Sequence, residues 1–335
     1  MRNRSLPLVL TFAIVMSFSL NFTYAQQATV TAENLKEWVS YLASDKMMGR
    51  RNGSPEMKVA ADWIAEKFRE MGLKPIAPSG DLIHNYTFTS RQSQVNERNV
   101  IGFLEGSDPA FKDEFIVLSA HFDHVGIKRG SKPDSIYNGA DDNAAGTAAI
   151  IGIAKALKAS GIKPGRSIIF TAFSGEENGM RGSRNFVANP PIPLNKIYAN
   201  LNFEMIGHSE YLGKRKYYMT GCLMSDLDDH IGVYNKKTAY ELVDTIKLSH
   251  ILFGSSDNIA FSRISTTSGV TTGIPSGTFA TTTMAPHIHN VTDEVSLFDF
   301  DNMADLVNHF SEVVIWLSKR KEEVKWTDKN FVKPE

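Results

Sequence analysis

The sequence predicts a single α/β domain with a mixed, mainly parallel β-sheet flanked by helices on both faces. Short apolar runs typical of buried strands alternate with longer segments of helical periodicity, which favours a sheet covered on both sides. The chain has 335 residues, 42% hydrophobic and 22% charged, so it can bury one large core. It shows no internal repeat, low-complexity linker or composition break that would divide it.

The first segment, residues 1–25, is predicted to be a signal peptide. Arg2 and Arg4 precede an apolar run over residues 6–22, and a small-residue cleavage site follows. A membrane anchor is the alternative, but the run is short and contains polar residues. No cysteine lies near the cleavage site, so lipid attachment there is excluded. We therefore expect the remaining domain, residues 26–335, to be exported to the periplasm or secreted, without a stable membrane anchor.

The elements of the domain follow from capping residues and apolar periodicity. Thr31 is the predicted N-cap of the first helix, and Ser54-Pro55 starts a second helix that ends at Gly72. The remaining prediction comprises strands at residues 86–90, 99–104, 115–120, 167–173 and 197–203, helices at 143–158 and 300–317, and long loops in the Ser-, Thr- and Gly-rich region 255–283.

Charge and cysteine content narrow the function. A net charge of -1 gives no reason to expect nucleic acid or an anionic membrane as a partner. The single cysteine, Cys222, excludes an internal disulfide and a cysteine-rich zinc site, so any metal must be held by histidines and carboxylates. Neither a phosphate-binding glycine motif nor a Ser-His-Asp nucleophile signature is apparent.

Three apolar strands in succession end in histidine or acidic residues. His121 and Asp123 follow the first strand, Glu176 and Glu177 the second, and Glu204 the third. A charged group at the end of a buried strand is costly unless it is paired or bound to metal. If these ends lie side by side, they gather more carboxylates than can ionise together without a cation. The mixture of histidine and carboxylate suits zinc.

The spacing within these motifs suggests separate duties. Residues two apart on a strand project to the same side, so Asp123 is expected to orient the ring of His121. By the same rule His124 is expected to face the other way and to pack in the core. The adjacent Glu176 and Glu177 diverge, so that one can bind metal while the other faces the water to be activated.

These motifs together resemble a known family. They are His121-Phe122-Asp123-His124, Asn138-Gly139-Ala140-Asp141-Asp142-Asn143, Gly175-Glu176-Glu177, Asn202-Phe203-Glu204-Met205, Ser256-Asp257-Asn258 and His289 with Asp293. In this order they resemble the aminopeptidases with two co-catalytic zinc ions, which include bacterial leucyl aminopeptidases and the glutamate carboxypeptidase and transferrin-receptor branch. The resemblance implies the zinc-peptidase fold, two zinc ions per chain and hydrolysis of peptides with a free N-terminus.

The resemblance also implies a role for each matching residue. His121 and Glu204 would bind one zinc, with Asp123 supporting His121. Asp141 would bridge both ions and form a cis peptide with Asp142, while Glu177 and His289 would complete the second site. Glu176 would be the general base of metal-assisted hydrolysis. Asp257 and Asn258 match a loop near the substrate and are candidate pocket residues.

Two positions depart from the family pattern. Glu204 stands where the family more often has aspartate, so the metal beside His121 is expected to sit differently or to bind more weakly. Ile288 stands where a tyrosine often precedes the last metal-binding histidine. His287 is a candidate to replace that phenolic donor, with a solvated or structural role as the alternative.

Two other functions stay open at this stage. A glutaminyl cyclase would use the same fold with one zinc, and a binding ectodomain would retain the fold with a dead site. The paired His121 and Glu204 positions favour two metals and hydrolysis over the cyclase. Competent side chains at Glu176 and at every ligand position favour an active enzyme over the ectodomain.

Overall fold

A computed structural model describes residues 30–76, 80–90, 92–128, 134–243, 246–266, 269–282 and 286–327. The predicted signal peptide, residues 1–25, lies outside the described residues. Among the residues that are described, no helix is long and apolar enough to cross a membrane.

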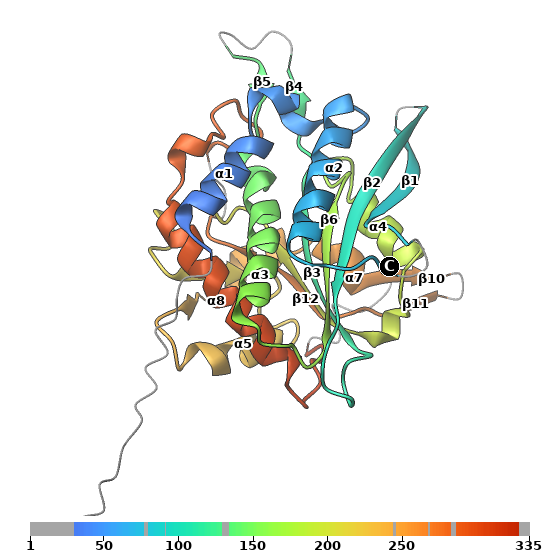
Figure 1. Ribbon diagram of the computed structural model, residues 1–335, viewed down its shortest axis with the longest axis vertical. Helices are drawn as coiled ribbons and strands as arrows, with labels where there is room; N and C mark the ends of the chain where they lie inside the picture. The colour runs from blue at the N-terminus through green and yellow to red at the C-terminus, as the bar shows by residue number, and fades with distance from the viewer. Residues whose placement is uncertain are drawn as a thin grey trace, which may run out of the picture.

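An eight-stranded mixed sheet forms the centre of the molecule (Figure 1). In spatial order its strands are β1 (Ile83–Ser90), β2 (Ser93–Leu104), β6 (Ser167–Phe173), β3 (Phe115–His121), β7 (Ile197–Phe203), β12 (Ser276–Ala280), β8 (Lys216–Met219) and β9 (Glu241–Leu242). The central strands β6, β3, β7 and β12 run parallel, whereas β1 and β2 form an antiparallel hairpin at one edge and β8 pairs antiparallel to β12. The predicted sheet type is confirmed.

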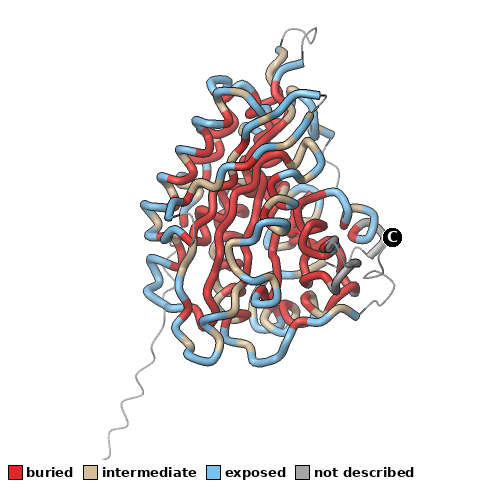
Figure 2. The backbone as a smooth tube through the Cα atoms, turned by 90° about the vertical axis from the view of Figure 1, so that its right-hand side faces the viewer, coloured by how far each residue is buried: buried red, intermediate tan, exposed pale blue. Residues whose placement is uncertain are grey.

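Helices cover both faces of this sheet (Figure 1). One face packs against α1 (Ala32–Leu42), α2 (Pro55–Glu70), α3 (Gly146–Ser160) and α8 (Phe300–Ser318), and the other against α4 (Arg181–Ala188) and α7 (Asn258–Ser262). Side chains of β3 alternate between the two cores, with Ile116 and Leu118 in one and Val117 in the other. Figure 2 shows the result, a buried centre with the exposed residues around it.

Smaller elements complete the domain. They are β4 (Gly126–Ile127) paired with β5 (Ile136–Tyr137), α5 (Leu227–Asn235), α6 (Ile246–Leu252), and β10 (Arg263–Thr266) paired with β11 (Gly269–Thr272).

The predicted helix starts are confirmed by their caps. Thr31 Oγ1 accepts a hydrogen bond from the Asn34 amide at 3.3 Å, and Ser54 Oγ accepts one from the Met57 amide at 3.3 Å. Helix α3, in contrast, starts at Gly146 instead of the predicted residue 143. The preceding residues, Ala140–Ala145, form a wide turn in which Asp142 and Asn143 have non-helical dihedrals.

The predicted loop region at residues 255–283 is wrong in part. It contains α7 and the central strand β12, which lies between β7 and β8. Every residue of β12 is buried, although the strand carries Ser, Gly and Thr, because it pairs with a neighbour on each side. Thr278 Oγ1 finds its buried partner in Asn258 Oδ1 at 2.9 Å. Tertiary pairing therefore overrides a composition that is typical of loops.

Candidate metal centre

The carboxyl ends of three neighbouring parallel strands meet at one edge of the sheet. β3 ends at His121, which pairs in register with Phe173 at the end of β6, and β7 ends at Phe203 just before Glu204. The predicted convergence of these ends is confirmed. A hollow of about 520 Å³ opens there, lined by Asp142, Glu176, Glu177, Glu204 and His289 together with apolar side chains.

Two groups of ligand-type side chains lie at this edge. The first group is His121, Asp142 and Glu204, with His121 Nε2 lying 3.3 Å from Asp142 Oδ1 and 3.5 Å from Glu204 Oε1. The second group is His124, Asp142, Glu177 and His289, with His289 Nε2 lying 3.2 Å from Asp142 Oδ2 and 3.0 Å from Glu177 Oε1. Asp142 thus directs one carboxylate oxygen to each group.

Asp142, and not the predicted Asp141, lies between the two groups. Asp141 Oδ1 instead accepts a hydrogen bond from the Gly207 amide at 2.8 Å, and Oδ2 faces His208 Nε2 at 3.7 Å. The cis peptide joins Asp142 to Asn143, so its predicted place between Asp141 and Asp142 is also wrong. Asp293 fixes this arrangement, because its two carboxylate oxygens accept the amides of Asp141 at 2.8 Å and Asp142 at 3.1 Å.

The side chain of His124 points toward the second ligand group, so the expected packing role is wrong. β3 ends at His121, and the alternation that would have turned His124 away no longer applies beyond that residue. His124 Nδ1 lies 3.1 Å from Glu177 Oε1 and 3.5 Å from Asp142 Oδ2. Its position within the motif His121-x-Asp123-His124 was the signal that could have found it.

Asp123 acts on the backbone of the glutamate loop instead of on the ring of His121. Its two carboxylate oxygens accept hydrogen bonds from the amides of Glu176 at 3.1 Å and Glu177 at 3.2 Å. The His121 Nδ1 atom lies 3.2 Å from the Asp123 backbone carbonyl but 3.8 Å from its carboxylate, which is too long for a hydrogen bond. The buried carboxylate therefore holds the loop that presents Glu176 and Glu177.

These residues fit a pair of cations. Within the described part of the chain, His121 Nε2 and His124 Nδ1 are buried without a hydrogen-bond partner, and both point at carboxylate oxygens. Burial also raises the pKa of Glu176 well above its usual range, and Glu204, Asp257 and Glu177 add to the effect. A cation in each group would supply the missing partners, and a donor set of histidines and carboxylates suits zinc.

The model of peptidase family M28 matches residues 99–314, more than half of the 335-residue chain. The chain belongs to peptidase family M28. Leucine aminopeptidase 1 of Trichophyton equinum is 24% identical over 292 residues, covering 84% of this chain and 72% of that protein. The structure of BSAP, a zinc aminopeptidase from Bacillus subtilis, matches with a TM-score of 0.62 at 17% identity, covering 87% of this chain and 96% of that one.

These similarities confirm the predicted family, its fold and an enzyme of the peptidase class. The M28 fold also matches a glutaminyl cyclase from Porphyromonas gingivalis, with a TM-score of 0.60 at 16% identity over 85% of this chain and 97% of that one. At such low identities the structural likeness shows the fold alone. The chemistry must therefore be argued from the site of this M28 chain.

Arg50 is a site residue that sequence reasoning missed. Its fully buried guanidinium donates hydrogen bonds to the backbone carbonyls of Leu42 at 2.5 Å, Phe122 at 2.7 Å, Asn138 at 2.7 Å and Gly139 at 2.8 Å. Its own carbonyl accepts the His124 amide at 3.1 Å. Burial lowers the pKa of Arg50 to about 10, against the pull of nearby carboxylates. No local pattern marks this arginine, because its partners are distant in sequence.

The three predicted pocket residues do not line the hollow of the M28 site. Asp257 is buried and accepts a hydrogen bond from Ser183 Oγ at 2.5 Å, and Asn258 donates to the Phe253 carbonyl at 3.0 Å. His287 Nδ1 lies 2.7 Å from Thr292 Oγ1. The hollow is lined instead by their neighbours, Ser255, Ser256 and Ile288.

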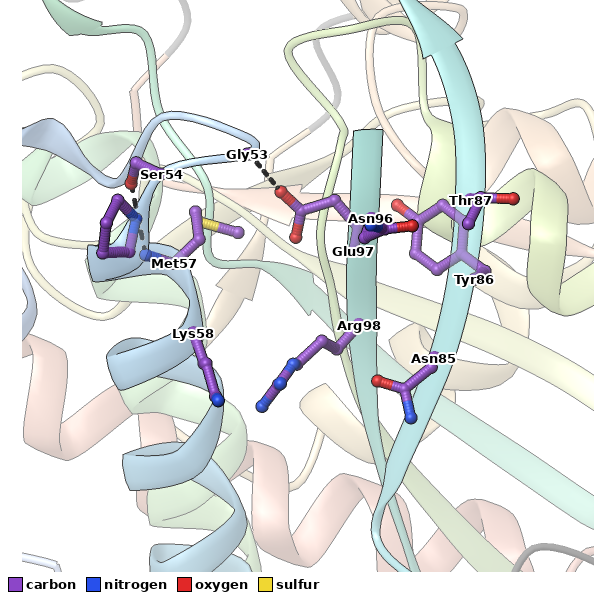
Figure 3. A pocket seen from close by; sticks show the side chains of 11 residues that line it. Gly53, Ser54, Met57, Lys58, Asn85, Tyr86, Thr87, Asn96, Glu97 and Arg98 are labelled. Atoms are coloured by element: carbon purple, nitrogen blue, oxygen red, sulfur yellow. Dashed lines mark hydrogen bonds between the residues drawn. The ribbon is translucent and has the colours of Figure 1, made fainter. Parts of the chain in front are cut away.

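A second hollow of about 740 Å³ lies between α2 and the β1–β2 hairpin (Figure 3). Its buried carboxylate, Glu97, turns toward Gly53 and accepts the Gly53 amide at 2.6 Å. Lys58 and Arg98 reach into the same space. Among the described residues, both groups of candidate metal ligands contribute side chains to the lining of the first hollow, so the chemistry is assigned there.

Proposed function

We propose that this M28 chain is an exported aminopeptidase that hydrolyses the N-terminal residue from peptides, using two zinc ions. The observation that carries the proposal is the position of Asp142, which offers Oδ1 to one ligand group and Oδ2 to the other. A single carboxylate shared in this way supports a two-metal site in which the ions act together. The family of the chain supports peptide hydrolysis as the reaction.

Each side chain has a defined duty in this proposal. His121 and Glu204 would hold one zinc and Glu177 and His289 the other, with Asp142 shared between them. Bound zinc would supply Lewis acidity and a water of lowered pKa. Glu176 lines the same hollow but belongs to neither ligand group, which suits a carboxylate that accepts a proton and later donates it.

The proposed hydrolysis consumes one water molecule, and Glu176 carries one proton from that water to the leaving amine. The water oxygen bonds to the carbonyl carbon of the first peptide bond, and Glu176 accepts the water proton. When the carbon–nitrogen bond breaks, Glu176 returns that proton to the leaving amine. Asp123 holds the amide of Glu176 at 3.1 Å, so this carboxylate is presented from a fixed loop.

The hollow also supports a preference for an apolar N-terminal side chain. Its lining combines carboxylates, which favour a cationic α-amine, with the apolar surfaces of Met205, Tyr218, Leu252 and Ile288. A peptide whose first residue is leucine would place its amine and its side chain against matching surfaces.

The test compares a leucyl peptide with its N-acetylated form, in wild type and in Glu176→Gln. We expect cleavage of the free peptide only, and a fall in kcat of at least about 100-fold in Glu176→Gln with bound zinc unchanged. Glu66→Gln, an exposed carboxylate that pairs with Arg69, is the matched control and should retain activity. One zinc per chain with cyclisation of N-terminal glutamine would indicate the glutaminyl cyclase. Two zincs with neither reaction would indicate a binding protein, and either result refutes the proposal.

Export is tested separately. Expression of the full chain in a bacterium, followed by cell fractionation and N-terminal sequencing, should recover a protein that begins at Gln26 outside the cytoplasm. An uncleaved protein held in the membrane fraction would support the anchor instead.

A further inference from the structure

His124 is buried, and neither of its ring nitrogens has a hydrogen-bond partner among the residues that the structure describes. An unpartnered buried polar atom costs about 1–3 kcal/mol, so a ring placed this way needs a compensating partner. The Nδ1 atom points between Glu177 Oε1, at 3.1 Å, and Asp142 Oδ2, at 3.5 Å. Both of these oxygens also lie next to His289 Nε2, at 3.0 and 3.2 Å.

These four distances match the edges of a zinc coordination tetrahedron. With bonds of about 2.0–2.1 Å from zinc to nitrogen or oxygen, neighbouring ligand atoms lie about 3.3 Å apart. The measured edges run from 3.0 to 3.5 Å. The first group has one histidine and two carboxylates at similar spacings, and so offers one protein ligand fewer.

The surrounding backbone holds the ring of His124 in this orientation. A Cβ at position 139 would lie 2.4 Å from His124 Cγ, so the ring packs directly on Gly139. The His124 amide donates to the Arg50 carbonyl at 3.1 Å, and the Arg50 side chain donates to the carbonyls of Phe122 and Gly139. His124 is therefore held against both ligand loops by the same arginine.

We propose that His124 is a direct zinc ligand through Nδ1, so that one position of the centre has four protein ligands and the other has three. This inference rests on the proposed two-zinc site and adds a ligand to it. By the general behaviour of zinc sites, four protein ligands close a site, whereas three leave a position for water or substrate. The position formed by His121, Asp142 and Glu204 is then the one that receives the reacting water, and the position with His124 mainly retains its ion.

The experiment measures zinc binding in the mature full-length protein and its variants. Zinc per chain is determined by mass spectrometry after dialysis against buffers of fixed free Zn²⁺. The substitution His121→Ala disables the metal position formed by His121, Asp142 and Glu204, so that binding at the other position is measured alone. His124→Ala or His124→Gln is then introduced into this His121→Ala background. Removing a residue that only hydrogen-bonds to a metal ligand typically weakens zinc binding by about 10–100-fold. Loss of His124, as a direct ligand, should therefore weaken zinc binding by at least about tenfold. His287→Ala, an adjacent histidine outside both groups, is the control and should change zinc affinity less than about threefold.

A second readout counts the imidazoles directly. Zinc K-edge X-ray absorption of the wild type should require three histidines across two ions, and of His124→Gln two histidines. Circular dichroism of the zinc-free variants checks that they remain folded. If they do not, the number of histidine ligands in the X-ray absorption spectrum of the wild type still tests the assignment. Unchanged affinity in both His124 variants, or two histidines in the wild type, would overturn the assignment of His124 alone. Wild type that binds fewer than two zincs would overturn the proposed two-zinc function.

Discussion

Replacing Arg50 with methionine should destabilise the zinc-free protein by about 3 kcal/mol. The change removes four charge-assisted hydrogen bonds to buried carbonyls. At a net value of about 1.5 kcal/mol each, these bonds contribute about 6 kcal/mol. The change also removes a buried charge, and the lowering of the Arg50 pKa from 12.5 to about 10 corresponds to a net cost of about 3 kcal/mol, which is the cost of burial less the attraction of nearby carboxylates. The difference between these two effects is the predicted loss.

The assay is urea unfolding at pH 7 in the presence of a chelator, so that zinc binding does not contribute to the measured free energy. Arg98→Met is the matched control, because Arg98 forms a partly exposed ion pair with Asp62 that should contribute less than about 1 kcal/mol. Arg50→Lys should fall between wild type and Arg50→Met, since an ammonium has only three donors for four carbonyls. A loss in Arg50→Met no larger than that in Arg98→Met would refute the reasoning.

Two further predictions concern single side chains. In Glu204→Asp the side chain is shorter by about 1.5 Å, so its carboxylate should leave the position that Glu204 occupies 3.5 Å from His121 Nε2. Zinc binding by the group that contains His121 should weaken at least about tenfold. Stronger zinc binding, measured by the same dialysis, would contradict this prediction. His309 packs on Tyr240 with ring centroids 3.9 Å apart, and burial lowers its pKa to about 4. Because the unfolded chain takes up a proton below about pH 6.5 and the folded ring does not, this stabilisation is present above pH 6.5 and is lost as the pH falls toward 4. In wild type, the free energy of unfolding should fall by about 3 kcal/mol through this group. In His309→Phe, the free energy of unfolding measured in urea should change less between pH 7 and 4.5 than it does in wild type. Identical changes in the two proteins would contradict the prediction.

The parts of the fold that were predictable are those with local signals. Strands β6 and β7 have the predicted bounds, because each is a short, mostly apolar segment flanked by polar residues. The caps of α1 and α2 were predictable because a threonine or serine stands directly before each helical pattern. β12 was not, because its polar and small side chains are satisfied by partners such as Asn258, which only the folded chain brings close.

The site residues also differ in whether a local signal could predict their positions. Residues at the end of a strand or directly after it, such as His121 and Glu204, lie in one ligand group as predicted, because the strand fixes where they emerge. His124 and Asp123 lie beyond the last paired residue of β3, where the two-residue alternation no longer holds. There the direction of a side chain depends on tertiary contacts, and both expectations made from alternation were wrong.

The one-residue error at the Asp-Asp pair has its cause in distant parts of the chain. Local sequence offers two identical carboxylates, and nothing within the stretch distinguishes them. Asp293 binds both of their amides, Arg50 binds the carbonyl of Gly139, and Asn143 donates to the Phe203 carbonyl at 2.9 Å. These partners lie 60 to 152 positions away in sequence, and together they set the wide turn that directs Asp142 toward both histidine groups. The identity of the shared ligand is therefore a property of the tertiary structure, since the turn that selects it exists only when all three contacts are made.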